Sequence, residues 1–153
     1  MTYIDIELAI VNYFGIRQNI IVPNCYITFG TSKDHECDLL IIKRSGYAFE
    51  VEIKVSKADL KADLKKKHSH EDERLKNLYY AMPKNLYEEC KDLIPINAGA
   101  ISINQFDNDF FASIERFAPN KKCRKLTDIE QLKFARLGVM RVWGLKNQLN
   151  KLS

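Results

Sequence analysis

The stretch CDLLIIKRSGYAFEVEIKV, residues 37–55, decides the fold because it has the pattern of two β-strands joined by a tight turn. Its two apolar runs are separated by residues 44–46, and a three-residue hairpin loop commonly ends in a glycine with left-handed backbone geometry. Such a loop pairs Lys43 with Tyr47, so that the numbers of opposed residues sum to 90. A two-residue turn over Ser45-Gly46 would shift the pairing by one residue. The three-residue loop is our prediction.

Acidic side chains occupy both predicted strands. In the strand 47–55 one set of alternating residues is wholly apolar or aromatic, and the other carries Glu50, Glu52 and Lys54. The predicted pairing places Asp38 opposite Glu52, with Cβ atoms roughly 5 Å apart on one side of the sheet. Two like charges in this position destabilise a sheet, and a divalent cation bound between them would reverse that effect.

Lys54 adds a positive charge next to this pair, roughly 7 Å beyond Glu52 along the same face. Two acids and a displaced ammonium suit phosphodiester hydrolysis. Asp38 and Glu52 would hold Mg²⁺ or Mn²⁺, which polarises a phosphoryl oxygen and lowers the pKa of a bound water. Lys54 would orient that water or stabilise the charge that develops on phosphorus. The alternative is that Glu50, Glu52 and Lys54 form the solvent-facing side of an amphipathic strand.

The remaining pattern predicts an α/β fold, a mixed β-sheet flanked by helices. Capping-box spacing at Thr2 and at Ser56 predicts two helix starts, and short β-branched or aromatic runs between Pro, Gly and Asn residues predict strands. The predicted strands are 20–22, 25–29, 37–43, 47–55, 78–82, 99–103 and 110–117. The predicted helices are 3–15, 57–68, 85–92 and 127–150.

Length and composition indicate one ordinary globular domain, residues 1–153. The apolar runs are far shorter than the ~18 residues of a membrane span. The first residues, MTYIDIELAIVNYF, carry acids but no lysine or arginine, unlike an export signal, so we expect a cytoplasmic protein without membrane contact. The four cysteines form no C-x-x-C pair, which argues against a zinc site and suits packing roles in a reducing compartment.

Lysine is concentrated in two runs, residues 54–67 and 121–125, although the net charge is only +4. A phosphate backbone responds to charges within about 8 Å, so these runs suit a polyanionic partner such as DNA, although a solvated helix face is the ordinary explanation for either run alone. In the second helix Lys57, Lys61 and Lys65 are four residues apart. They would form a line of phosphate contacts beside the metal.

Other polar residues of this region have simpler roles. We expect Asp59 to cap the helix together with Ser56, and Asp63 to pair with Lys67. His68 and His70 lie in a polar stretch with no third ligand, so we expect them in an exposed loop rather than at a metal.

At these residues the chain resembles the PD-(D/E)XK nuclease superfamily. Asp38 matches its first acid, and residues 52–54 match its (D/E)-x-K tripeptide. The segments EIKVSKADLKADLKKKH, LKNLYYAMP and IPINAGAISI, within about residues 36–104, look like the MmcB-like DNA repair subgroup. Cys37 replaces the proline that usually precedes the first acid, and Lys66 stands where this subgroup often has tryptophan.

The resemblance implies a restriction-endonuclease-like fold and metal-dependent cleavage of DNA. It implies the backbone carbonyl of Ile53 as a further metal ligand and Glu7, on the first helix, as the residue that completes the site. A favourable interaction of Glu7 with the helix dipole is the other explanation for that acid.

We therefore expect a Mg²⁺-dependent deoxyribonuclease of DNA repair or processing. A domain this small has little room for a separate recognition module, so double-strand cleavage would require a homodimer or a repair-protein partner. The alternatives are a non-catalytic DNA-binding module of the same fold and a purely protein-interacting subunit.

Overall fold

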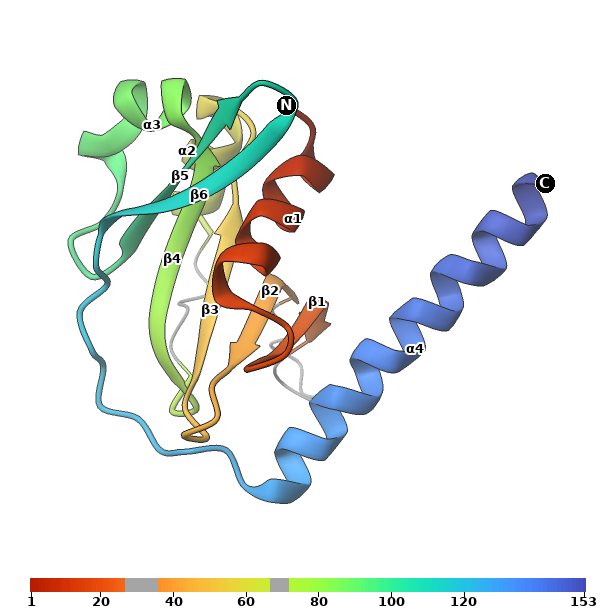
Figure 1. Cartoon of the computed structure of the whole chain (residues 1–153). Coiled ribbons are helices and arrows are strands. Elements are labelled where there is room, and N and C mark those ends of the chain that lie inside the picture. The colour runs from red at the N-terminus through yellow and green to blue at the C-terminus, as the bar shows by residue number, and fades with distance from the viewer. Residues whose placement is uncertain (27–35, 67–71) are drawn as a thin grey trace.

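A mixed six-stranded sheet with helices on both faces forms the body of the protein (Figure 1). This computed structural model describes residues 1–26, 36–66 and 72–153. The described strands are β1 (Ile20–Tyr26), β2 (Glu36–Ile42), β3 (Ala48–Ile53), β4 (Leu75–Pro83), β5 (Gly99–Phe106) and β6 (Asp109–Arg116). The described helices are α1 (Tyr3–Phe14), α2 (Lys57–Leu64), α3 (Lys84–Cys90) and α4 (Asp128–Leu152), with a 3₁₀ turn η1 (Lys91–Leu93). The predicted α/β fold is confirmed.

The strands lie in the sheet in the same order as in the chain. β1, β2 and β3 are antiparallel neighbours, and so are β5 and β6. β3, β4 and β5 run parallel, and the chain returns between them through α2 and α3. Parallel neighbours need such crossover connections, and they leave the central strands covered on both faces.

The β2–β3 hairpin has the predicted register. Ile42 lies opposite Ala48, and the three further pairs of this ladder keep the sum of 90. The Lys43 N–H donates to the Tyr47 carbonyl over 2.9 Å, and Gly46 adopts a φ of 87°. The predicted three-residue loop, ending in a left-handed glycine, is therefore confirmed.

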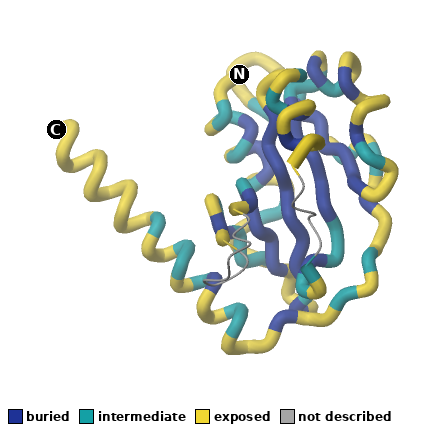
Figure 2. The backbone as a smooth tube through the Cα atoms, turned by 180° about the vertical axis from the view of Figure 1, so that it is seen from behind, coloured by how far each residue is buried: buried dark blue, intermediate teal, exposed yellow. Residues whose placement is uncertain are grey.

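Three apolar clusters hold the layers together, as the buried central strands in Figure 2 indicate. On one face α1 packs through Ile6, Ala9 and Ile10 against alternate residues of the central strands. On the other face the start of α4 packs through Phe134 over β1 and β2, while α2 and α3 cover the region around Tyr80.

Several predicted boundaries are wrong. β1 is one strand rather than two, because it lies at the edge of the sheet, where Pro23 costs no ladder hydrogen bond. α2 ends at Leu64, earlier than predicted, and β4 begins at Leu75 rather than at residue 78. The expected strand residues 27–29, the pairing partner Lys67 and the two histidines at 68 and 70 lie outside the described residues.

The cysteines act as packing residues, as predicted: Cys25, Cys37 and Cys90 are buried and Cys123 is half-buried, all as free thiols. Among the helices of the described ranges, none has the length and apolar content needed to cross a membrane.

Candidate active site

The charged side of β3 is buried. Glu50, Glu52 and Lys54 are only 0%, 3% and 4% exposed, so the alternative of a solvent-facing strand side is wrong. The reason is that β3 is a central strand whose second face lies under α2 and beside Tyr80 of β4. Burial of charged groups is costly unless they are paired or hydrogen-bonded, so this arrangement needs specific partners.

Asp38 lies where β2 and β3 part. In an antiparallel ladder every second opposed pair is joined by two backbone hydrogen bonds. Counting in steps of two from the bonded pair Lys43–Tyr47, Cys37 and Ile53 would form another bonded pair. The ladder ends before that pair, and the Ile53 N–H donates instead to Oδ2 of Asp38 over 2.7 Å. The carbonyl of an extended residue points the same way as its N–H, so the Ile53 carbonyl also faces the opening between the strands.

Lys54 is held by two carboxylates. Its Nζ atom donates to Oε2 of Glu52 over 3.0 Å and lies 3.4 Å from Oδ1 of Asp63. Asp63 is buried on α2, where it also accepts from the Tyr80 hydroxyl over 3.0 Å and pairs with Lys66. The prediction that Asp63 pairs with Lys67 therefore missed its main contacts, which point into the sheet.

The acids of this cluster hold their protons more strongly than usual. Burial, followed by the charges of Asp38 and Glu50, raises the pKa of Glu52 from 4.5 to about 8, against the opposing effect of Lys54. Burial also raises the pKa of Asp38, although the Ile53 N–H and Lys54 oppose the shift.

Two neighbouring groups respond to these acids. Burial alone would lower the pKa of Lys54, but the carboxylates of Glu52 and Asp63 outweigh burial and raise it, so the ammonium stays charged. The Tyr3 hydroxyl of α1 lies beside Asp38, and burial together with that carboxylate raises the pKa of Tyr3.

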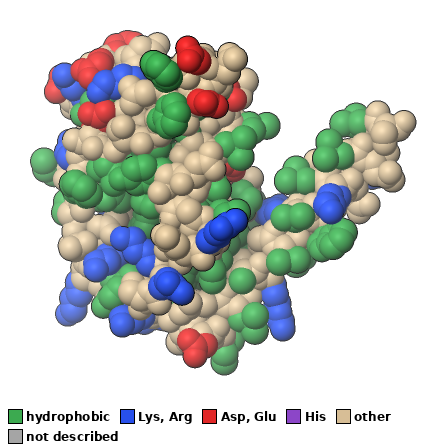
Figure 3. Space-filling model, viewed as in Figure 1, with side chains coloured by type: hydrophobic (Ala, Val, Ile, Leu, Met, Phe, Trp, Pro, Cys, Tyr) green, Lys and Arg blue, Asp and Glu red, His purple; other side chains and the backbone are tan. Residues whose placement is uncertain are grey.

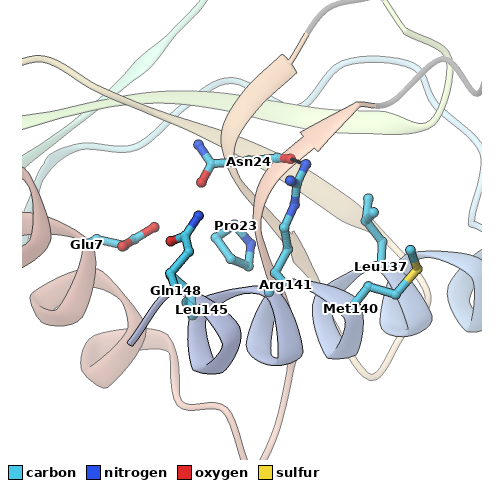
Figure 4. Close-up of a pocket in the computed structure, with 9 residues that line it drawn as sticks. Glu7, Pro23, Asn24, Leu137, Met140, Arg141, Leu145 and Gln148 are labelled. Atoms are coloured by element: carbon cyan, nitrogen blue, oxygen red, sulfur yellow. Dashed lines mark hydrogen bonds between the residues drawn. The ribbon is translucent and has the colours of Figure 1, made fainter. Parts of the chain in front are cut away.

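Glu7 approaches Asp38 from α1. It is half-buried, and burial followed by the charge of Asp38 raises its pKa. Its side chain lines a groove of about 480 Å³ between α1, β1 and α4, where it faces Gln148, while Arg141 donates to the Asn24 carbonyl (Figure 4). Thr2 and Asp5 form the capping box at the start of α1. Glu7 is therefore not needed as a cap, and it faces this groove instead.

The predicted lysine line is only partly available. Lys61 and Lys65 are exposed, and Lys65 lies at the C-cap of α2 rather than inside the helix. Lys57 forms a 3.0 Å ion pair with Glu89 of α3. The second lysine run is remote from the acids, because Lys125 packs over Tyr47 at the opposite end of the β2–β3 hairpin.

Sequence reasoning missed two residues that hold Lys54 in place. The signal for Asp63 is its spacing of three residues from the fully buried Leu60, which puts both on the sheet-facing side of α2. The signal for Tyr80 is weaker, since an aromatic residue in a buried strand gives no indication that its hydroxyl reaches a carboxylate.

The residues where β2 and β3 part include oxygen donors of the kind that small divalent cations bind. The hydrogen bonds described above use one oxygen each of Asp38 and Glu52, and a carboxylate has two oxygens with two lone pairs each. Mg²⁺ typically takes one or two carboxylates and retains several waters. Within the described ranges, no group of three or more His, Cys, Asp or Glu side chains could hold a metal ion, and the residues that could act as ligands here are two carboxylates and a backbone carbonyl.

Comparison with known proteins adds a fold neighbour. No protein-family model matches the chain, and no curated protein matches it. The SPO1766 protein of unknown function from Silicibacter pomeroyi has a similar structure, with a TM-score of 0.64 and 18% sequence identity. The likeness covers 95% of this chain and 89% of that one, and at this identity it shows the fold alone.

Proposed function

We propose that this protein is a metal-dependent nuclease that hydrolyses DNA phosphodiester bonds, in repair or processing. The observation that supports the proposal is the cluster of half-buried Asp38 with buried Glu52 and Lys54 at the point where β2 and β3 part. Strongly perturbed acids gathered at one opening are typical of functional sites. A cytoplasmic setting remains our expectation from the sequence.

In this mechanism Asp38, Glu52 and the Ile53 carbonyl would hold Mg²⁺ or Mn²⁺, and Glu7 would complete the acidic wall from α1. The cation supplies charge neutralisation at the scissile phosphate and an activated water. Lys54 stays charged beside Asp63 and stabilises the negative charge that develops on phosphorus. The Ile53 N–H of β3 keeps Asp38 oriented toward the opening.

The exposed lysines of α2 suggest how a nucleic acid would approach. Lys61 lies on α2 and Lys65 caps its end. This helix directly follows β3, the strand that carries the acids. Phosphate contacts of this kind position the backbone without reading bases. DNA is therefore our proposed substrate, with a homodimer or a repair protein as the expected partner for double-strand cleavage.

Nicking of supercoiled plasmid in Mg²⁺ tests the mechanism. Glu52→Gln and Lys54→Met should both abolish nicking, since each removes a charge from the cluster with little change of volume. Glu89→Gln, an exposed acid on α3, is the matched control and should nick like the parent. Circular dichroism should show all three folded, and parent-like nicking by both cluster variants would overturn the proposal.

A second candidate is a DNA-binding module that does not cut. The favouring observation is the contact of Lys54 with Asp63 as well as Glu52, because such a pairing also serves a purely structural network. This candidate predicts salt-sensitive DNA binding that is indifferent to chelator and to Glu52→Gln. The nuclease predicts that EDTA abolishes cleavage and that Glu52→Gln weakens metal binding.

A further inference from the structure

α4 carries an apolar stripe on the side that faces away from the sheet. Ile129, Leu132, Val139 and Trp143 are all more than half exposed, with Ile129 at 69% and Trp143 at 62%. The opposite side of the helix holds Phe134, which is buried against β1 and β2. Figure 3 shows apolar side chains along this projecting helix.

The spacing of the stripe is that of a helix-pairing seam. Residues 129, 132, 136, 139 and 143 alternate by three and four along α4, and Arg136 is the single charged member. Apolar residues at this spacing form the a and d positions of a coiled coil. A helix that packs on its own domain needs one apolar side, which Phe134 and its neighbours already provide, so the second stripe is surplus to the fold.

The helix also extends beyond the body that supports it. α4 has 25 residues, and its C-terminal half projects from the sheet (Figure 1). Val142, Leu145, Leu149 and Leu152 are also at least half exposed there, but helical spacing puts them on the other sides of α4, and Leu145 lines the groove beside β1. At roughly 100 Å² each, the four exposed apolar side chains of the stripe offer about 400 Å², half of the ~800 Å² that each partner buries in a standard interface, so the pairing is a weak, transient one.

The charges of α4 favour an antiparallel pairing with a copy of itself. Both acids of the helix, Asp128 and Glu130, lie in its first turn, whereas Lys146 and Lys151 lie near its end. Antiparallel association brings the acidic turn of one helix toward the basic end of the other and opposes the two helix dipoles. Because the stripe points away from each sheet, the two bodies stay on the outer sides of the pair.

We propose that two copies of this chain dimerise through their α4 helices, antiparallel, with the stripe as the seam. The register that buries the stripe places Leu132 of one copy beside Trp143 of the other, and Val139 beside the aliphatic stem of Arg136. The modest area gives a dimer that dissociates in the micromolar range.

Light scattering coupled to size exclusion tests the association. At about 100 µM the chain should be a dimer, and at about 1 µM it should be largely a monomer. Val139→Glu should remain monomeric at both concentrations, while Gln148→Glu, which adds the same charge on the groove side of α4, should dimerise like the parent. A parent that is monomeric at the higher concentration, or a Val139→Glu dimer, would overturn the proposal.

Trp143 is the single tryptophan and reports directly on the seam. Its emission should shift to the red on dilution, and Val139→Glu should show the red-shifted emission throughout. For the orientation, a mixture of Leu132→Cys and Trp143→Cys copies should cross-link on mild oxidation, while neither copy alone does so more than the parent. Emission that is independent of concentration but shifts to the blue with anionic phospholipid vesicles would overturn the dimer and assign the stripe to a membrane surface.

Discussion

The pH dependence of stability should report the unusual acid at the centre of the site. The pKa of Glu52 is raised from 4.5 in the unfolded chain to about 8 in the folded protein, with burial as the main cause. Between these values the folded state binds a proton that the unfolded state does not. The stability due to this proton is complete below pH 4.5 and is lost as the pH rises through about 8.

Glu52→Gln removes this titration while keeping the shape of the side chain. One proton difference gives a slope of about 1.4 kcal/mol per pH unit in the free energy of unfolding. Between pH ~5.5 and pH ~8.5 the variant should therefore gain about 3 kcal/mol relative to the parent. Other titrating groups are common to both proteins and cancel in the difference.

Urea unfolding in EDTA, followed by circular dichroism over this pH range, measures the two curves. Glu89→Gln serves as the control, because its side chain is exposed, and its curve should run parallel to that of the parent. A difference between the parent and Glu52→Gln that stays constant from acid to alkaline pH would refute the reasoning. It would mean that Glu52 is ionised normally in the folded protein.

Three further outcomes follow from the same contacts. Mg²⁺ at ~100 times its dissociation constant should stabilise the parent at alkaline pH by about 2.7 kcal/mol, and Glu52→Gln should lose this gain in thermal unfolding. Tyr80→Phe removes the hydroxyl that donates to Asp63, and should cost about 1–2 kcal/mol in urea unfolding. Lys61→Ala should lower the salt slope of DNA binding by about one unit without changing sequence preference, as filter binding over a salt series would show.

The hairpin could be predicted because its determinants are local. The alternation in residues 47–55 fixes which side chains share a face, and Gly46 fixes the turn, so the pairing from Ile42–Ala48 to Leu39–Val51 follows by counting, and Asp38 comes one residue beyond it. The continuity of β1 could not be predicted in the same way. A proline is tolerated there because of the edge position, which is a property of the whole sheet.

The candidate site was predicted only where it lies within the hairpin. Asp38, Glu52 and Lys54 come together through one turn, whereas Asp63 reaches Lys54 only because α2 packs its Leu60 side onto the sheet. Charge patterns along one helix favour neighbours in sequence, so they pointed to Lys67. Contacts between a helix and the sheet depend on how the β3–α2–β4 connection places the helix. A local sequence pattern does not predict that placement.

The charge balance of the cluster offers a test between a catalytic site and a structural one. Asp38, Glu52 and Asp63 lie near the ammonium of Lys54, which is the buried lysine of the described ranges, and Glu50 adds a fourth acid while Lys66 pairs with Asp63 from outside. A structural network is stable when its charges are matched, and here the excess is relieved by a proton that Glu52 keeps up to about pH 8. A divalent cation would compete with that proton for the same oxygens, so metal affinity should increase with pH. We therefore expect nicking at subsaturating Mg²⁺ to rise up to about pH 8 and then level, and nicking that is equally fast at pH ~6 would show that Glu52 binds no cation.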